Sequence, residues 1–218
     1  MPTIVKENYL KALYFLNEQD SRINLTELSK SLDVSKPTAS NMIKSLKEHG
    51  WVDYKRYKPI TLTDKGKKAA AAVIRKHRLT EMFLDKIMGF GWEEVHEIAE
   101  QIEHTDSEAF FNRMDEMLDH PTIDPHGSPI PDVDGNIVDQ DFHVLADLQV
   151  GQKGELAALQ HSSSDLLHLL NEKGIQLRIT VELINKEPFD GSCVISYDGQ
   201  SPFTISKKVA QSLLLKII

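Results

Sequence analysis

The sequence has little cysteine and no long apolar run, and each shortage excludes a class of protein. A single cysteine, Cys193, in 218 residues excludes an internal disulfide framework. The longest apolar runs fall far short of the roughly 18 residues that a membrane-spanning helix needs. The N-terminus also lacks the charged and then apolar pattern of a signal peptide. These absences predict a soluble cytoplasmic protein without a membrane partner, long enough for one to three domains.

Charge is distributed unevenly along the chain, although its net value is only −8. Residues 1–80 contain 16 Lys and Arg against 8 Asp and Glu, and the remainder contains 9 against 25. A basic N-terminal third suggests a polyanionic partner, whereas the acidic remainder suggests either cation binding or solubility alone.

The basic third shows the order of a winged helix-turn-helix. Apolar residues recur at helical spacing in NYLKALYFLNE (8–18), and Thr26 is the expected cap of a short helix in TELSKSLD. A third helix is predicted in KPTASNMIKSLKEHG (36–50), where proline suits the first turn and glycine the end. WVDYKRYKPITLT (51–63) then predicts a β-hairpin with a basic tip, followed by a helix opened by Thr63-Asp64.

Short polar side chains at the start of the third helix suit base edges in a major groove, and basic residues of a wing suit phosphates. Taken singly, such residues often only cap a helix or face solvent. Their order, together with the positive charge, favours a DNA-binding domain. The candidate DNA-binding residues are Ser35, Pro37, Thr38, Ser40, Asn41, Lys44, Lys55 and Arg56.

Helices also dominate the middle of the chain. One is predicted from Asp64 to about residue 88, a second over EVHEIAEQIEH (94–104) and a third from about 106 to 118. Such an array suits dimerisation through residues 92–118. The fold class is therefore mainly α, with a winged helix-turn-helix (1–63) and a helical dimerisation domain (64–119). A proline-rich linker (120–142) and a small β-barrel (143–218) complete the expected domains.

The segment EVHEIAEQIEH carries an unusual polar stripe. At about 100° per residue, His96, Glu100, Glu103 and His104 fall beside the apolar face of one helix, and His77 and Glu81 form a pair four apart on the helix before it. A solvated face is the simple alternative, but six such residues on two successive helices favour a divalent cation site. HEIAE differs from the zinc-protease motif HExxH, because its fifth residue is glutamate.

With these motifs the chain resembles the diphtheria-toxin-repressor (DtxR/MntR) family of iron- and manganese-dependent repressors. The resemblance lies in SKPTASNMIKSL (35–46), RKHRLTEMFL (75–84), VHEIAEQIEH (95–104) and DPHGSPIP (124–131). The tail (143–218) is similar to the SH3-like (FeoA-type) domain of longer members, and residues 64–119 then correspond to the metal-binding and dimerisation domain. It implies a homodimer that binds operator DNA when metal occupies two neighbouring sites. By this resemblance the primary ligands are Asn8, Glu100, Glu103 and His104, and the ancillary ligands are His77, Glu81 and His96.

Some positions depart from the family pattern. Asn8 stands where aspartate or methionine is usual, and Glu100 stands where iron sensors have cysteine. Oxygen ligands favour Mn²⁺ as the cofactor, with Fe²⁺ as the alternative metal. Further candidates for the ancillary site are Asp124, His126, Gln160 and His161. The alternative is that these four are ordinary loop residues.

We therefore expect a manganese-dependent transcriptional repressor of metal-homeostasis genes rather than an enzyme. Two alternatives stay open at this point. One is a winged-helix regulator that responds to a small organic ligand or to Fe²⁺. The other is a metal-dependent hydrolase, which needs an open coordination position and a general base.

Overall fold

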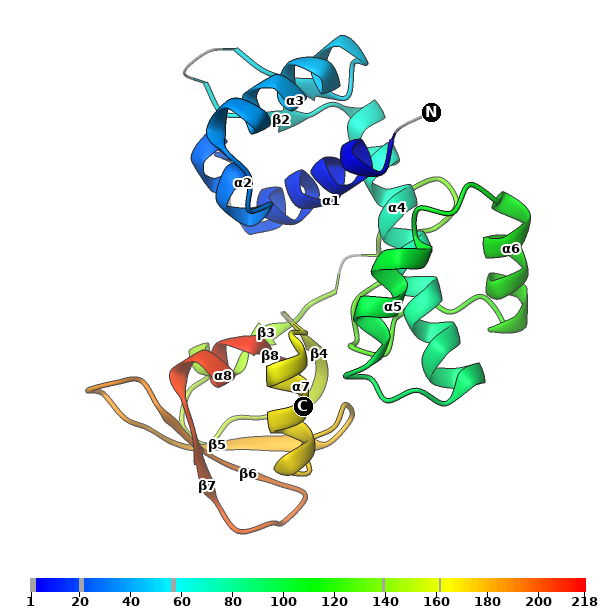
Figure 1. Ribbon diagram of the computed structural model, residues 1–218. Coiled ribbons are helices and arrows are strands. Elements are labelled where there is room, and N and C mark those ends of the chain that lie inside the picture. The colour runs from blue at the N-terminus through cyan, green and yellow to red at the C-terminus, as the bar shows by residue number, and fades with distance from the viewer. Residues whose placement is uncertain (1–2, 20–21, 56–57, 139, 161) are drawn as a thin grey trace. The chain divides into compact units, whose positions relative to one another are not determined.

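The first three helices and a short hairpin form a winged helix-turn-helix in the computed structural model (Figure 1). The structure describes residues 3–19, 22–55, 58–138, 140–160 and 162–218. The elements of the winged helix, in chain order, are α1 (Ile4–Gln19), α2 (Leu25–Ser31), α3 (Lys36–Glu48), β1 (Val52–Asp53) and β2 (Thr61–Leu62). The predicted order of elements is confirmed, although Arg56 at the tip of the wing lies outside the described residues.

Side-chain caps fix where the short helices begin. The cap of α2 is Asn24 rather than the predicted Thr26: its Oδ1 accepts hydrogen bonds from the backbone N–H groups of Thr26 and Glu27, at 2.9 and 3.1 Å. Glu27 accepts in return from the backbone N–H of Asn24, which completes a capping box. Ser35 caps α3 in the same way by accepting from Thr38 N.

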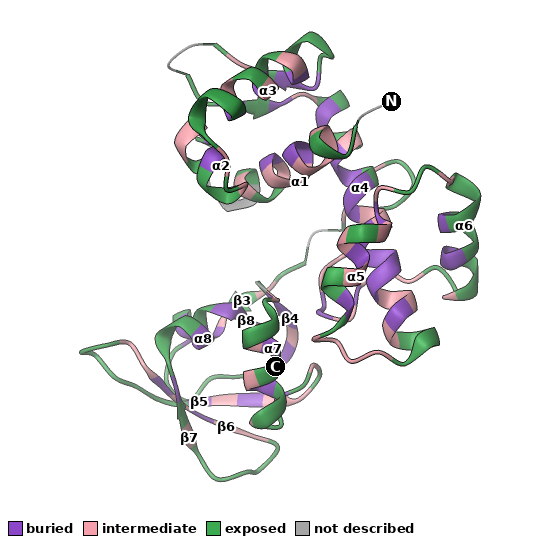
Figure 2. Ribbon diagram, in the orientation of Figure 1, coloured by how far each residue is buried: buried purple, intermediate pink, exposed green. Residues whose placement is uncertain are grey.

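Apolar side chains from all three helices fill the core of the winged helix. Leu10 and Leu13 of α1, Leu28 of α2, and Ile43 and Leu46 of α3 are fully buried. Burial of each such side chain stabilises the fold by about 1.5–3 kcal/mol. The face of α3 opposite to this core is left to solvent, as Figure 2 shows by its colouring.

Helix α4 (Asp64–Phe83) follows the wing directly. Thr63 Oγ1 accepts from Gly66 N at 3.0 Å and so opens the helix as predicted. A Cβ atom at Gly66 would lie 1.9 Å from the carbonyl oxygen of Trp51, so the wing and the helix approach this closely only because residue 66 is glycine. After Phe83 the chain makes one π-helical turn, Leu84–Met88, which ends at Gly89 with φ of +77°.

Two shorter helices follow, α5 (Val95–Ile102) and α6 (Glu108–Met117). Helix α5 ends two residues earlier than predicted, so Glu103 and His104 lie in the turn after it. The backbone N–H of Glu103 still donates to Ala99 O at 2.9 Å, and this bond continues the helical direction by one residue. Glu103 therefore continues the polar stripe of His96 and Glu100 past the last residue of the helix.

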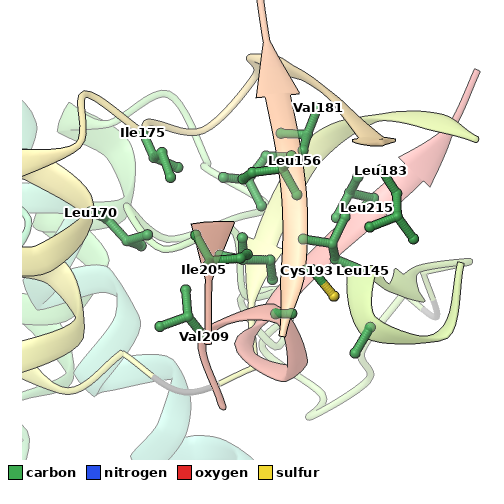
Figure 3. Close-up of a cluster of buried hydrophobic side chains, with 14 of the residues drawn as sticks. Leu145, Leu156, Leu170, Ile175, Val181, Leu183, Cys193, Ile205, Val209 and Leu215 are labelled. Atoms are coloured by element: carbon green, nitrogen blue, oxygen red, sulfur yellow. The ribbon is translucent and has the colours of Figure 1, made fainter. Parts of the chain in front are cut away.

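The C-terminal region is a six-stranded antiparallel sheet with the order β3-β8-β4-β5-β6-β7. Its elements are β3 (His143–Val144), β4 (Lys153–Leu159), α7 (Ser164–Glu172), β5 (Thr180–Lys186), β6 (Cys193–Tyr197), β7 (Phe203–Ile205), α8 (Lys207–Ser212) and β8 (Leu213–Ile217). Figure 3 shows the buried side chains between them, among which Leu156, Val181 and Leu215 are fully buried. Cys193 is also part of this core, where burial raises the pKa of its thiol.

The chain forms two compact units, each of which is described by itself. The first comprises Met1–Thr80, Ala99–Thr122 and Ile130–Ile137, and the second comprises Glu81–Ile98, Ile123–Pro129 and Val138–Ile218. In the described part of the chain, no helix combines the length and apolar character needed to cross a bilayer.

Candidate metal centre and nucleic-acid interface

Three charged side chains of the first unit meet where α1 contacts α5 and the turn after it. Lys11 Nζ lies 2.5 Å from Glu100 Oε1, and 2.7 and 2.9 Å from Oε1 and Oε2 of Glu103. The Glu103 side chain is fully buried, and that of Lys11 is 12% exposed. A buried carboxylate needs a positive partner, and here the ammonium of Lys11 supplies part of that charge.

His77 of α4 also contacts Glu103, with 2.5 Å between His77 Nδ1 and Glu103 Oε2. Burial by itself raises the pKa of the Glu103 carboxyl. The hydrogen bond from His77 and the charge of Lys11 outweigh this effect and hold the pKa below its ordinary value. Glu103 is therefore a carboxylate at neutral pH, which is the form that ligates a cation.

His104 and two residues of α1 extend this group. His104 Nδ1 lies 2.6 Å from Glu7 Oε2, and its Nε2 lies 3.4 Å from Glu103 Oε1. One residue further along α1, the buried Oδ1 of Asn8 has no hydrogen-bond partner among the described residues. An unpaired buried carbonyl oxygen costs roughly 1–3 kcal/mol, and a cation that it ligates would recover this energy. We call Glu7, Asn8, Lys11, His77, Glu100, Glu103 and His104 the first cluster.

The donors of the first cluster suit a hard divalent cation. They are carboxylate oxygens, imidazole nitrogens and one amide oxygen, with no thiolate among them. Two ligand atoms that share an octahedral ion at about 2.1 Å lie about 3 Å apart, which is near the 3.4 Å between His104 Nε2 and Glu103 Oε1. The observation that most favours a ligand here is the buried Oδ1 of Asn8, which has no hydrogen-bond partner among the described residues and lies on the helix that carries Glu7 and Lys11. The residues present therefore fit a metal such as Mn²⁺.

A second group of possible ligands lies in the second unit. One ligand atom each from Glu81, Asp124 and His126 lies within 4.8 Å of the other two, and all three residues are buried. Asp124 is held by a tight turn, because its Oδ1 accepts from the backbone N–H groups of His126 and Ser128, at 2.8 and 2.9 Å. We call Glu81, Asp124 and His126 the second cluster.

The imidazole of His126 is oriented for ligation. Its Nε2 lies 2.7 Å from the carbonyl oxygen of Trp92 and donates to it, so Nδ1 faces the Glu81 carboxylate at 3.7 Å. Burial lowers the pKa of His126, but Glu81 and Asp124 raise it by more, so the net direction is upward. The two carboxylates thus favour either a proton or a metal ion at Nδ1.

The other metal-ligand candidates from the sequence are His96, Gln160 and His161. His96 is half-exposed, and its Nδ1 lies 3.1 Å from Glu81 Oε1. Gln160 is exposed and directly follows β4. His161 lies outside the described residues.

Sequence reasoning missed Glu7 and Lys11, although the pattern carried a signal for both. On α1, Glu7 and Lys11 are four residues apart and flank Asn8, so the three side chains share one sector of the helix. Of the three, only Asn8 is a candidate from the sequence, because the family resemblance implies a ligand at that position. That a lysine should point at the proposed ligands requires the packing of α1, which no local pattern reveals.

The candidate DNA-binding residues lie on the exposed side of the winged helix. Pro37, Thr38, Asn41 and Lys44 of α3 are exposed, Ser40 is half-buried, and Lys55 of the wing is exposed. Ser35 is occupied as the cap of α3, and its Oγ lies 2.8 Å from Thr38 Oγ1. Arg56 lies outside the described residues. The exposed row of short polar side chains has the form of a major-groove reading helix.

Comparison with protein families matches nearly the whole chain. Residues 1–60 match the iron-dependent repressor N-terminal DNA-binding domain. Residues 63–132 match the iron-dependent repressor metal-binding and dimerisation domain. Residues 143–217 match the FeoA domain.

Individual relatives agree with these matches. The chain is 30% identical to the diphtheria toxin repressor of Corynebacterium efficiens, over 88% of this chain and 87% of that protein. It is 29% identical to the iron-dependent repressor IdeR of Mycobacterium tuberculosis, over 95% and 94%. Among solved structures, a manganese-dependent transcriptional repressor in complex with manganese has a TM-score of 0.90 and 31% identity, covering 98% of this chain and 100% of that one. ScaR with bound Cd²⁺ has a TM-score of 0.85 and 32% identity, covering 100% of both chains.

Proposed function

Because this chain belongs to the diphtheria-toxin-repressor family of metal-dependent DNA-binding repressors, we propose that it is a manganese-responsive repressor of metal-homeostasis genes. The single observation that most supports the metal is the buried Oδ1 of Asn8, which has no hydrogen-bond partner among the described residues and lies on the helix whose Glu7 and Lys11 contact the other proposed ligands. Relatives named for iron and neighbours named for manganese both occur, so the preference for Mn²⁺ is argued from the ligands.

The primary site would hold Mn²⁺ through Asn8, Glu100, Glu103 and His104. Its donors are oxygen and nitrogen, which suit Mn²⁺ by hardness, whereas a thiolate would favour softer metals. The intrinsic order of affinities still places Zn²⁺ above Mn²⁺, so the selection of Mn²⁺ depends on geometry and on which metal is available. The acidic oxygens would supply the negative charge that a divalent cation requires.

The ancillary site is proposed to combine the predicted His77, Glu81 and His96 with Asp124 and His126. The second cluster supports the last two, because it buries two carboxylates and an oriented imidazole within ligand distance of one another. His77 contacts Glu103 of the first cluster. Its assignment to the ancillary site therefore rests on the family resemblance.

The domains proposed from the sequence assign each step of regulation to one region. Residues 1–63 would read DNA, residues 64–119 would bind metal and dimerise through residues 92–118, and residues 120–142 would link them to the domain at 143–218. Metal bound between α1 and the α5 turn would hold the reading helix in one position relative to the dimerisation helices. Free Mn²⁺ would then set the fraction of the homodimer that is competent for a near-palindromic operator.

A DNA-binding titration tests this proposal. Candidate operator fragments are titrated with the full chain in the presence of Mn²⁺, Fe²⁺, Zn²⁺ or a chelator, at one fixed salt concentration. We expect specific binding with Mn²⁺ and its loss with the chelator. Equal specific binding in both would exclude metal control and favour a regulator that senses an organic ligand.

A further inference from the structure

The side chain of Lys11 occupies the ligands of the proposed primary site. Its Nζ makes three short contacts, at 2.5 Å with Glu100 and at 2.7 and 2.9 Å with the two oxygens of Glu103. A lysine ammonium has three donors, so these contacts use the full donor capacity of Lys11. The carboxylate oxygens that face Lys11 are the ones that a metal would need.

A cation bound to Glu100 and Glu103 would repel the ammonium and compete with it for the same lone pairs. The hydrogen bonds between the Lys11 ammonium and the Glu103 carboxylate join two charged groups and are shielded from water, because the Glu103 side chain is fully buried and that of Lys11 is 12% exposed. The four-carbon stem of lysine nevertheless lets the ammonium move to water without movement of its helix. Lys11 and a metal ion are therefore mutually exclusive partners of these carboxylates.

We propose that Lys11 is a built-in competitor of the metal, which neutralises Glu100 and Glu103 in the metal-free protein and raises the metal concentration needed for activation. This inference rests on the proposed function, since it concerns the same site. Lys11 also joins α1 to α5 and the turn after it, the elements that a metal would join. Metal binding thus replaces one cationic link by another.

The competition has a consequence for selectivity. Displacement of the ammonium costs the same free energy whichever divalent ion arrives, so Lys11 lowers the affinity for Mn²⁺ and Zn²⁺ by the same factor. A lysine that only ties α1 to the α5 turn makes the opposite prediction. Such a lysine would stay in place when metal binds, and its removal would leave metal affinity unchanged or weaken it.

The test compares Lys11→Met with two controls. Lys11→Arg keeps the positive charge at the site. Lys6→Met removes the same charge from the same helix, where the Lys6 ammonium lies 3.1 Å from His49 Nε2 rather than at the carboxylates. Mn²⁺ affinity is measured by EPR and Zn²⁺ affinity by competition with a chelating dye, for the binding step that Glu103→Gln removes.

We expect Lys11→Met to bind both metals about tenfold to hundredfold more tightly, which corresponds to the loss of charge-assisted hydrogen bonds. Lys6→Met and Lys11→Arg should stay near the parental affinity. If the parent binds Mn²⁺ and Lys11→Met binds it no more tightly, the inference is wrong while the proposed function stands. If the parent takes up no Mn²⁺ at this step, the proposed function fails and the inference fails with it.

A measurement on the unaltered protein guards against a variant that does not fold. In protein labelled with ¹⁵N-lysine, the Lys11 ammonium should give a protected NMR signal in the metal-free state. Addition of diamagnetic Zn²⁺ should abolish this protection as the ammonium moves to water. A Lys11 signal that stays protected with Zn²⁺ bound at this site would overturn the inference.

Discussion

Glu103→Gln is the substitution whose effect the structure defines most sharply. The side chain is fully buried and accepts hydrogen bonds from both Lys11 and His77. Glutamine has the same shape, but it carries no charge and turns an NH₂ donor towards groups that are themselves donors. Removal of one partner from a buried charge pair costs about 3–5 kcal/mol, so both the metal-free fold and the metal site should weaken.

The effect on metal follows from the same loss. In Glu103→Gln, Glu100 is the one carboxylate left among the four proposed ligands of the primary site. The positive charge of the divalent ion is then poorly neutralised. Since about 1.4 kcal/mol corresponds to a factor of ten, Mn²⁺ affinity should fall roughly 10²- to 10³-fold. Metal-stimulated operator binding should then be lost at Mn²⁺ concentrations that saturate the parent.

The assay pairs EPR titration of Mn²⁺ with fluorescence anisotropy on an operator fragment. Glu108→Gln is the matched control, because Glu108 is an exposed residue in the first turn of α6 and the charge change is the same. Circular dichroism establishes that each variant is folded under the conditions used. A folded Glu103→Gln protein with parental Mn²⁺ affinity and activation would refute the assignment of this carboxylate as a ligand.

Four further predictions follow from the two clusters and the exposed faces. Asn41→Ala should relax base preference by about 1–3 kcal/mol in competition assays, whereas Lys55→Ala should weaken binding to all sequences and lower the salt slope by about one; equal effects on specific and random DNA from both would contradict this division. Phe110, 42% exposed on α6, should lie in the dimer interface, so Phe110→Glu should sediment as a monomer at micromolar concentration. Asn8→Asp adds a third carboxylate and should tighten Mn²⁺ binding about tenfold in calorimetry, and weaker binding would exclude Asn8 as a ligand. Folding raises the pKa of His126 above 6.5, so the protonated imidazole stabilises the protein without metal fully below pH 6.5, and this stabilisation is lost as the pH rises through the folded-state pKa. Calorimetry should show the Mn²⁺ affinity of the second cluster increasing as the pH rises through this pKa, because His126 must lose its proton to ligate the metal. A pH-independent affinity would argue against ligation by His126.

The order of elements was predictable because local patterns determine it. The spacing of Leu10, Leu13, Ile43 and Leu46 fixes the buried faces of α1 and α3, and the strand-forming runs near residues 180, 195 and 204 mark β5, β6 and β7. Strands β4 and β8 were not predicted, because β4 is rich in alanine and leucine, β8 is mostly leucine, and both strands pair only with distant residues. The π-helical turn before Gly89 likewise leaves no local signature.

The candidate site was only partly predictable, for a related reason. The spacing within one helix places His77 near Glu81, and His96 near Glu100, without any knowledge of packing. The contact between Lys11 and Glu103 joins residues 92 positions apart in sequence, and it depends on how α1 packs in the first unit. A pattern within one segment therefore identifies ligands of one element but not their partners from another.

The second cluster shows the same limit. Asp124 was recognised as a candidate from its place beside Pro125 and His126, but its role could not be decided from sequence. What supports it is a turn that fixes the carboxylate and a tautomer of His126 that is set by the carbonyl oxygen of Trp92. Neither feature is visible before the loop is folded.

The most direct test of metal control is its reciprocity. If Mn²⁺ tightens operator binding by some factor, then operator DNA must tighten Mn²⁺ binding by the same factor. Both affinities are measured on the full chain at one salt concentration, Mn²⁺ by EPR with and without operator, and operator by anisotropy with and without Mn²⁺. We expect equal factors of about tenfold or more, and these should vanish when random DNA replaces the operator. An Mn²⁺ affinity that is the same with and without operator would contradict metal control.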